Sequence, residues 1–426
     1  MKRRSIMAAM MALITAGGLL TGCGANGAKE NPGAGQNSVQ GESHAKTELT
    51  FFHYLEQYQD QFDKLAEMYA EANPDVELKI ECIGSDYDKI LQTRVASGEV
   101  PDIFISGPYM KNQNYASVSY DLSNEEFVKE VEIGPEFKAS NGELTAIPFV
   151  TQAWGVLYNQ EVFEKLGITE APETLEELDV VCRKIQDAGI IPFAMGYKSD
   201  YVKKQLFGFT FGVDENYKQN IEQLANKEKE LKDFKFIYKI FDGAELVGKY
   251  LQPNPFNDDF ATAGAKLGTG EAAMMICGDQ IVQNARKANP DSTIGLMPYP
   301  LSNDPADAKI YTCASAGLHV SRDSANRDAA LEFINWMVTS QEVKDWLSND
   351  MEILSAIKGV TPTGSQVMMD AQKWTSEGKA SAWASNLFPQ GVETELISAM
   401  DKFLLGDISK EEAIDEMNTA WTEFEN

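Results

Sequence analysis

Histidine and cysteine are scarce in this sequence, and that scarcity limits the chemistry the chain can perform. There are 3 histidines and 5 cysteines among 426 residues. His44, His53 and His319 are isolated, and no C-x-x-C pair or Cys/His pair has the spacing of metal ligands. The motifs G-x-S-x-G and H-E-x-x-H and the phosphate-binding loop are absent as well. We therefore expect no metal and no cofactor.

The sequence is also poor in positively charged residues. The chain has 37 Lys and Arg against 65 Asp and Glu, which gives a formal charge of −28. Without a basic patch such a chain repels a phosphate backbone, so we expect no nucleic-acid partner. A hydrophobic content of 43% and a charged content of 24% are those of a folded soluble protein, and the length suits about two domains.

The N-terminus has the features of an export signal. A basic start, Met1–Arg4, precedes an apolar run, Ile6–Leu20, that is short for a membrane span. It ends in Leu-Thr-Gly-Cys at 20–23, which resembles the lipobox of bacterial lipoproteins. The resemblance implies a signal peptide at 1–22 and lipidation of Cys23 with a palmitate-type chain. It also implies a flexible, Gly- and Asn-rich tether at 23–46 on the outer face of the cell membrane. An ordinary signal peptide with a chance cysteine is the alternative.

The other four cysteines are predicted to be buried free thiols. Each lies among apolar residues, although an exported chain could also form disulfides. They are Cys82, Cys182, Cys277 and Cys313.

Strands and helices alternate along the mature chain, which is the pattern of an α/β protein with parallel sheets. Strands are predicted at 49–53, 76–82, 100–105, 190–195, 272–277 and 310–320. Helices are predicted at 58–72, 86–97, 161–166, 203–250 and 326–350. Thr174 and Glu177 have the spacing of a capping box that begins a helix running to about residue 188.

The stretch IPFVTQAWGVLYN, residues 147–159, has two apolar runs joined by Thr151 and Gln152. It predicts either one long bent strand shared by two lobes or a hairpin on an ordinary sheet. The first interpretation would create an interlobe cleft, where small-molecule sites are common.

Five segments together are similar to the sugar-binding branch of the extracellular solute-binding proteins of ABC importers, which includes the maltose-binding proteins. They are RVASGEVPDIF (94–104), ELTAIPFVTQAWGVLYNQEVFEKLGI (143–168), TLEELDVVCRKIQDAGIIPFAMG (174–196), GTGEAAMMICGDQ (268–280) and SRDSANRDAALEFINWMV (321–338). The sequence departs from the family at Gly278-Asp279-Gln280, because a Trp often follows the Gly there.

The resemblance implies a two-lobed periplasmic-binding-protein fold of type II, with a multi-segment hinge. The first lobe is expected at 47–151 plus 316–350, and the second at 152–315 plus 351–426. The implied function is to capture a mono- or oligosaccharide between the lobes and deliver it to membrane permease subunits, without turnover.

A sugar ring offers an apolar face to aromatic side chains and a rim of hydroxyls to polar ones. Tyr54 and Glu56 follow the first strand, where the resemblance implies sugar contacts; a plain surface loop is the alternative. Ser106 and Tyr109 follow the third strand at the edge where open sheets bind ligands, although Tyr109 could instead face its own lobe.

The remaining candidates belong to the crossing stretch and the second lobe. Gln152 takes the position of a sugar-binding carboxylate in relatives, and Trp154 is either a stacking or a core residue. Tyr197 and Asp200 match a region of sugar contact. Further candidates are Asp279 and Gln280 at a helix start, Ser315 at a second crossing, and Trp383 as a second platform.

An exported enzyme is the rival hypothesis. Ser355–Lys358 matches S-x-x-K, but S-D-N and K-T-G are absent, and a glycosidase leaves no fixed spacing of its paired acids. A binding protein for a non-sugar solute is the other alternative.

Overall fold

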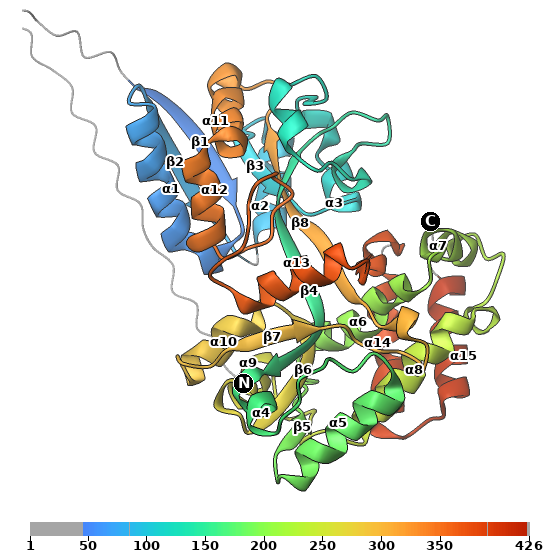
Figure 1. Cartoon of the computed structure of the whole chain (residues 1–426). Helices are drawn as coiled ribbons and strands as arrows, with labels where there is room; N and C mark the ends of the chain where they lie inside the picture. Colours follow the sequence, from blue (N-terminus) through green and yellow to red (C-terminus); the bar gives the residue numbers. More distant parts are fainter. Residues whose placement is uncertain (1–45, 85, 390, 424–426) are drawn as a thin grey trace, which may run out of the picture. The chain divides into compact units, whose positions relative to one another are not determined.

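A computed structural model describes residues 46–84, 86–389 and 391–423. The signal peptide, Cys23 and the tether, apart from Lys46, lie outside these ranges. The described residues belong to one compact unit, shown in Figure 1. No helix in the described ranges is long and apolar enough to cross a membrane.

The described part contains two separate hydrophobic cores, and each defines a lobe. The first core includes Phe51, Phe62, Phe104, Leu318, Phe333, Trp346 and Val360. The second core includes Trp154, Leu157, Phe241, Met275, Tyr311, Val367 and Trp421. This is the two-lobed α/β architecture that the sequence predicts.

The first lobe alternates strands and helices as expected. Its strands are β1 (Thr47–His53), β2 (Val76–Cys82) and β3 (Ile103–Ser106), and its helices are α1 (Gln59–Ala72), α2 (Tyr87–Ser97), α3 (Met110–Gln113), α11 (Arg327–Thr339) and α12 (Gln341–Asn349). Strand β1 pairs in parallel with both β2 and β3. Helix α2 ends at Gly98, whose φ of 77° is the left-handed conformation that favours glycine.

The second lobe carries most of the helices. Its strands are β5 (Ile191–Phe193), β6 (Ala272–Gly278), β7 (Ile294–Met297) and β9 (Ala380–Ala382). Its helices are α4 (Gln160–Lys165), α5 (Leu175–Asp187), α6 (Asp200–Gly208), α7 (Tyr217–Ala225), α8 (Lys235–Gly248), α9 (Phe260–Thr269), α10 (Ile281–Ala288), α13 (Gln366–Ser376), α14 (Val392–Leu405) and α15 (Lys410–Glu423).

Two long strands connect the lobes, β4 (Ile147–Asn159) and β8 (Ile310–Val320), which pair antiparallel with each other. The first half of β4 belongs to the first core and the second half to the second core. The bent-strand interpretation of 147–159 is therefore right. The register shifts between Pro148 and Val150 and again between Val150 and Thr151, so the bend lies where the cores meet. Both strands run between the two bodies in Figure 1.

Three local expectations need correction. The segment 203–250 is broken into α6, α7 and α8 with 3₁₀ turns between them, and 326–350 divides into α11 and α12 at the extended Ser340. Thr174 does cap α5 by accepting from the Glu177 N–H at 3.2 Å, but the Glu177 carboxylate accepts from Glu173 N, not from Thr174. Met351, Ile353, Ile357 and Val360 pack in the first core, while Leu354 packs against the second, so this stretch forms a third crossing segment.

Candidate functional site

The crossing strands present two opposite faces. Gln152 pairs with Cys313, while Thr151 pairs with Ala314 and Ala153 with Thr312. Because successive side chains of a strand point to opposite sides, Gln152 and Cys313 share one face, here called the front face. Thr151, Thr312 and Ala314 share the other, called the rear face.

The front face gathers aromatic and polar groups from both lobes. The Tyr54 hydroxyl donates to the Ser315 carbonyl at 3.0 Å, and Asn386 Nδ2 donates to Cys313 Sγ at 3.2 Å. Burial, followed by the nearby Glu136 carboxylate, raises the pKa of the Cys313 thiol to about 12. Tyr54 comes from the first lobe and Asn386 from the second. Tyr54, which follows β1, therefore meets Ser315 in the middle of β8.

Tyr109 has a strained backbone beside this face. Its φ is 54° and its ψ is −114°, a region that residues with a Cβ rarely adopt. The hydroxyl donates to Glu136 Oε1 at 3.3 Å, and the side chain is half-buried. Such strain costs about 1–3 kcal/mol and is concentrated at functional sites.

The turn between β6 and α10 supplies hydrogen-bond acceptors from Asp279 and Gln280. Asp279 N donates to the Ala153 carbonyl at 2.9 Å, and Asp279 Oδ1 accepts from Ala153 N at 3.0 Å, so the turn is fixed to β4. Burial raises the pKa of this carboxyl to about 7. Gln280 Oε1 is buried and has no hydrogen-bond partner in the described part of the chain. A ligand that donates hydrogen bonds would satisfy it.

Tyr58 also belongs to this site, although the sequence analysis did not select it. It lies between the first strand and α1. Burial first, and then the Asp279 and Glu352 carboxylates, raise the pKa of its hydroxyl. Tyr58 therefore lies near Asp279 from the opposite lobe. Its position four residues after Tyr54, in the same loop, was the available signal.

Two predicted aromatic contacts are buried in the second core. Trp154 is 0% exposed and packs edge-on against Phe209, Tyr299 and Tyr311. Tyr197 is 1% exposed and packs against Phe256. Neither ring has a face open to a ligand, and this burial contradicts a direct contact. Trp383 is half-buried, stacks on Phe209 at 4.3 Å between ring centroids, and donates from Nε1 to the Tyr311 carbonyl at 3.0 Å.

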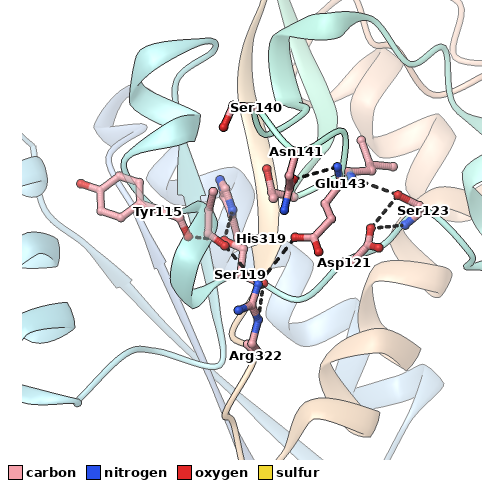
Figure 2. A network of polar contacts seen from close by, with 12 residues as sticks. Tyr115, Ser119, Asp121, Ser123, Ser140, Asn141, Glu143, His319 and Arg322 are labelled. Atoms are coloured by element: carbon pink, nitrogen blue, oxygen red, sulfur yellow. Dashed lines mark hydrogen bonds and ion pairs between the residues drawn. The ribbon is translucent and has the colours of Figure 1, made fainter.

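Ser106 is likewise enclosed, which contradicts a direct ligand contact. The residue is 1% exposed and its hydroxyl lies 2.7 Å from His319 Nε2, while His319 Nδ1 lies 2.7 Å from Ser119 Oγ. Figure 2 shows this network continuing from Ser119 to Arg322. Ser106 therefore helps to hold β8 in the first lobe.

Two predicted contacts are exposed. Glu56 lies beside Gly84, where an added Cβ would meet its carboxyl carbon at 2.2 Å. Asp200 begins α6 and forms an ion pair with Lys203 at 3.1 Å. Their roles toward a ligand stay predictions.

The rear face lines a cavity of about 850 Å³. Its walls come from the crossing strands, the third crossing segment and α13, and Glu136 lies at the border with the front face. The lining residues are Glu132, Ile133, Gly134, Glu136, Pro148, Thr151, Thr312, Ala314, Leu354–Thr361, Gln372, Thr375 and Ser376. None is aromatic, so the cavity lacks the flat apolar surface that a sugar ring needs. The front face remains the better candidate.

The described residues contain no group of three or more His, Cys, Asp or Glu that could hold a metal ion. The front face thus offers hydroxyl, amide, carboxyl and aromatic groups, which suit reversible binding of a polar organic molecule.

These features define a class: two-lobed solute-binding proteins. Solved structures share the fold. RafE from Streptococcus pneumoniae in its apo form superposes with a TM-score of 0.74 at 20% identity, covering 89% of this chain and 98% of RafE. A RafE complex with raffinose gives 0.72 at 19%, covering 88% and 99%. A sugar transporter protein from Bacillus licheniformis in complex with stachyose gives 0.66 at 17%, covering 88% and 98%.

The family follows from the sequence match. The model of the bacterial extracellular solute-binding proteins matches residues 54–344, and the chain belongs to this family of binding proteins. The melibiose/raffinose/stachyose-binding protein MelE of Bacillus subtilis is 23% identical over 316 residues, which are 70% of this chain and 72% of MelE. The maltotriose-binding protein of Pyrococcus abyssi is 23% identical over 324 residues, 73% of this chain and 65% of that protein.

Proposed function

We propose that this protein captures a neutral carbohydrate, a mono- or oligosaccharide, on the front face between its lobes and delivers it to the permease of an ABC importer. Two observations support the proposal: Tyr54 of the first lobe reaches the Ser315 carbonyl of β8, and Tyr58 of the first lobe lies near Asp279 of the second. Gln152 and Gln280 are proposed as further ligand contacts. These groups come from both lobes, so a ligand that contacts them all would favour the closed arrangement. A ligand shifts a conformational equilibrium only by such differential contacts.

The chemistry of the site suits hydroxyl groups. Gln280 Oε1 is a buried acceptor without a donor, and Asp279 has no cation in contact among the described residues. Sugar hydroxyls would supply donors to both groups. The named ligands of the relatives, which include melibiose, raffinose, stachyose and maltotriose, support a carbohydrate.

We also propose that the protein is anchored to the membrane by a lipid and that it releases its sugar chemically unchanged. The Leu-Thr-Gly-Cys sequence at 20–23 supports lipidation of Cys23, and an acyl chain would hold the protein beside a membrane permease. Binding without turnover is expected, because a delivered sugar must leave intact.

The test is a thermal-shift screen of mono- and oligosaccharides, followed by calorimetric titration of each hit. A bound ligand raises the unfolding temperature by mass action. Amino acids and polyamines serve as solute controls, and chromatography of the sugar after long incubation tests for cleavage. A cleaved glycosidic bond, or stabilisation only by a non-sugar solute, would overturn the proposal.

Gln152→Ala gives a residue-level test, with Thr151→Ala as its matched control on the opposite face of the same strand. Gln152→Ala is expected to weaken sugar binding about 10-fold or more, the effect of losing one or two hydrogen bonds to a buried ligand. Thr151→Ala is expected to leave affinity unchanged, because the Thr151 bond to Leu354 uses the backbone N–H. Equal effects of the two substitutions would contradict the assignment of the front face.

A further inference from the structure

An ion pair joins the two lobes next to the candidate site. Arg286 Nη1 lies 2.8 Å from Glu352 Oε2. Arg286 belongs to α10, which buries Ile281 and Ala285 in the second core. Glu352 lies between Met351 and Ile353, which are both buried in the first core. The pair therefore connects two bodies that share only the crossing segments as covalent links.

The backbone of Glu352 is held in an unfavourable conformation. Its φ is 51°, the left-handed region that costs a residue with a Cβ about 1–2 kcal/mol. Gly364 leaves room for the side chain, because a Cβ added there would lie 2.9 Å from Glu352 Oε1 and 3.0 Å from Cγ. Strain of this kind persists where surrounding contacts determine the conformation. The surroundings therefore hold the backbone of Glu352 in place, and its carboxylate contacts Arg286.

The ion pair is close to the ligand-facing groups. Burial, and then the Asp279 and Glu352 carboxylates, raise the pKa of the Tyr58 hydroxyl, so both carboxylates lie near it. Helix α10 begins directly after Asp279 and Gln280 and carries Arg286 one and a half turns further on. If α10 moved away from the first lobe, Arg286 would separate from Glu352, and Asp279 and Gln280 would move away from Tyr58 at the same time.

We propose that the Arg286–Glu352 ion pair is a latch that stabilises the arrangement of the lobes in which these two residues are in contact, and so increases ligand affinity. The affinity part rests on the proposed function, whereas the effect on lobe arrangement does not. The Arg286 and Glu352 side chains are 42% and 30% exposed, so salt screens the pair and its effect is modest. We expect its loss to weaken ligand binding about three- to fivefold at low ionic strength.

The chain offers a matched control on the same segment. Lys64 Nζ pairs with Asp350 Oδ1 at 2.8 Å, two residues before Glu352. Lys64 lies on α1, between the first-core residues Phe62 and Leu65. This ion pair joins two parts of the first lobe. Lys64→Gln removes a similar surface ion pair without touching the link between lobes.

The experiment compares Arg286→Gln, Glu352→Gln, the double variant, the charge swap Arg286→Glu with Glu352→Arg, and Lys64→Gln. Small-angle scattering of the ligand-free proteins measures the radius of gyration, and titration with raffinose measures affinity at 50 and 500 mM NaCl. We expect both single variants and the double variant to show the same larger radius and the same loss of affinity. The swap should recover part of both, Lys64→Gln should match the wild type, and 500 mM NaCl should reduce the differences.

The latch would be overturned if Arg286→Gln and Glu352→Gln left the ligand-free radius and the affinity unchanged. Additive effects of the two substitutions, or an equal effect of Lys64→Gln, would also overturn it. If raffinose does not bind to any of the proteins, the scattering of the ligand-free variants still decides on the latch, while the proposed function is tested separately by the sugar screen.

Discussion

At the scale of single residues, buried titratable groups give the protein opposing responses to pH. Burial lowers the pKa of His319 to about 3 and that of His53 to about 4, so the folded state resists their protonation. Both residues therefore destabilise the fold as the pH falls below about 6.5. Asp279 acts in the other direction, because burial raises its pKa to about 7.

Asp279→Asn is predicted to change the pH dependence of stability. Between pH 3.8 and about 7 the folded state binds a proton at Asp279 that the unfolded state has lost, so wild-type stability falls as the pH rises through this window. Asparagine keeps the oxygen that accepts from Ala153 N and removes the titration. The variant should gain up to about 4 kcal/mol relative to the wild type between pH 4 and pH 8.

Urea unfolding midpoints at pH 5, 6, 7 and 8 measure this difference, and the histidine contributions cancel because both proteins contain them. If the unfolding midpoints of the two proteins changed in parallel with pH, the pKa of Asp279 would be the same in the folded and unfolded states, and the prediction would be wrong.

The sequence indicates which residues could contact a ligand, but it does not indicate which of them are buried. Gln152 was placed on the crossing strand because two apolar runs flank it, and the structure confirms that position. Trp154, two residues further on, is also on the front side but belongs to the second core, where Phe209, Tyr299 and Tyr311 enclose it. Those neighbours come from segments 55 to 157 residues away in the chain, so no local pattern could predict the enclosure.

At the scale of elements, α9 and α10 pack unusually closely. A Cβ at Gly268 would lie 2.3 Å from the Ala285 carbonyl oxygen, and one at Gly264 would lie 2.4 Å from Ile281 Cδ1. The two glycines are four residues apart and share one face of α9. This close contact between the helices determines the position of α10, and therefore the positions of Asp279, Gln280 and Arg286.

Gly268→Ala is predicted to push α10 away from α9, because the contacting atoms at Ala285 are backbone atoms that cannot rotate aside. We expect a loss of about 1–3 kcal/mol in the free energy of unfolding, together with weaker sugar binding.

Gly248→Ala, at the end of α8, is the control, because an added Cβ there meets nothing within 4 Å. That substitution should stabilise by about 0.5–1 kcal/mol. Chemical unfolding and sugar titration of both variants provide the measurement, and a destabilised Gly248→Ala with an unaffected Gly268→Ala would contradict this account.

Most elements were predictable because their signals are local. Period-2 and period-3.6 patterns found β1, β2, α1, α2 and β6, and Gly98 marked the end of α2. The β4–β8 register was not predictable, since it depends on a bulge and a partner about 160 residues away. The break at Ser340 was missed because the apolar periodicity continues across it.

At the scale of the whole molecule, the described residues, which begin at Lys46, belong to one compact unit. A chain starting at Ala45 is therefore predicted to keep the urea midpoint and sugar affinity of the chain that starts at Gly24, while losing any membrane attachment. Equilibrium unfolding, sugar titration and flotation with vesicles compare the lipidated protein with both soluble forms. A lower midpoint for the shorter chain would show that residues 24–44 stabilise the folded unit.

The pairing of β3 with β8 has a consequence for biosynthesis. Ile103–Ser106 can complete its sheet only with Gly317–Val320, which the ribosome adds more than 200 residues later. The sheet of the first lobe therefore cannot be completed until nearly three quarters of the polypeptide has been made, and one edge of β3 remains unpaired in the meantime. An unpaired edge strand can pair with another chain, so the first lobe is predicted to be the part of the protein most prone to aggregation during synthesis.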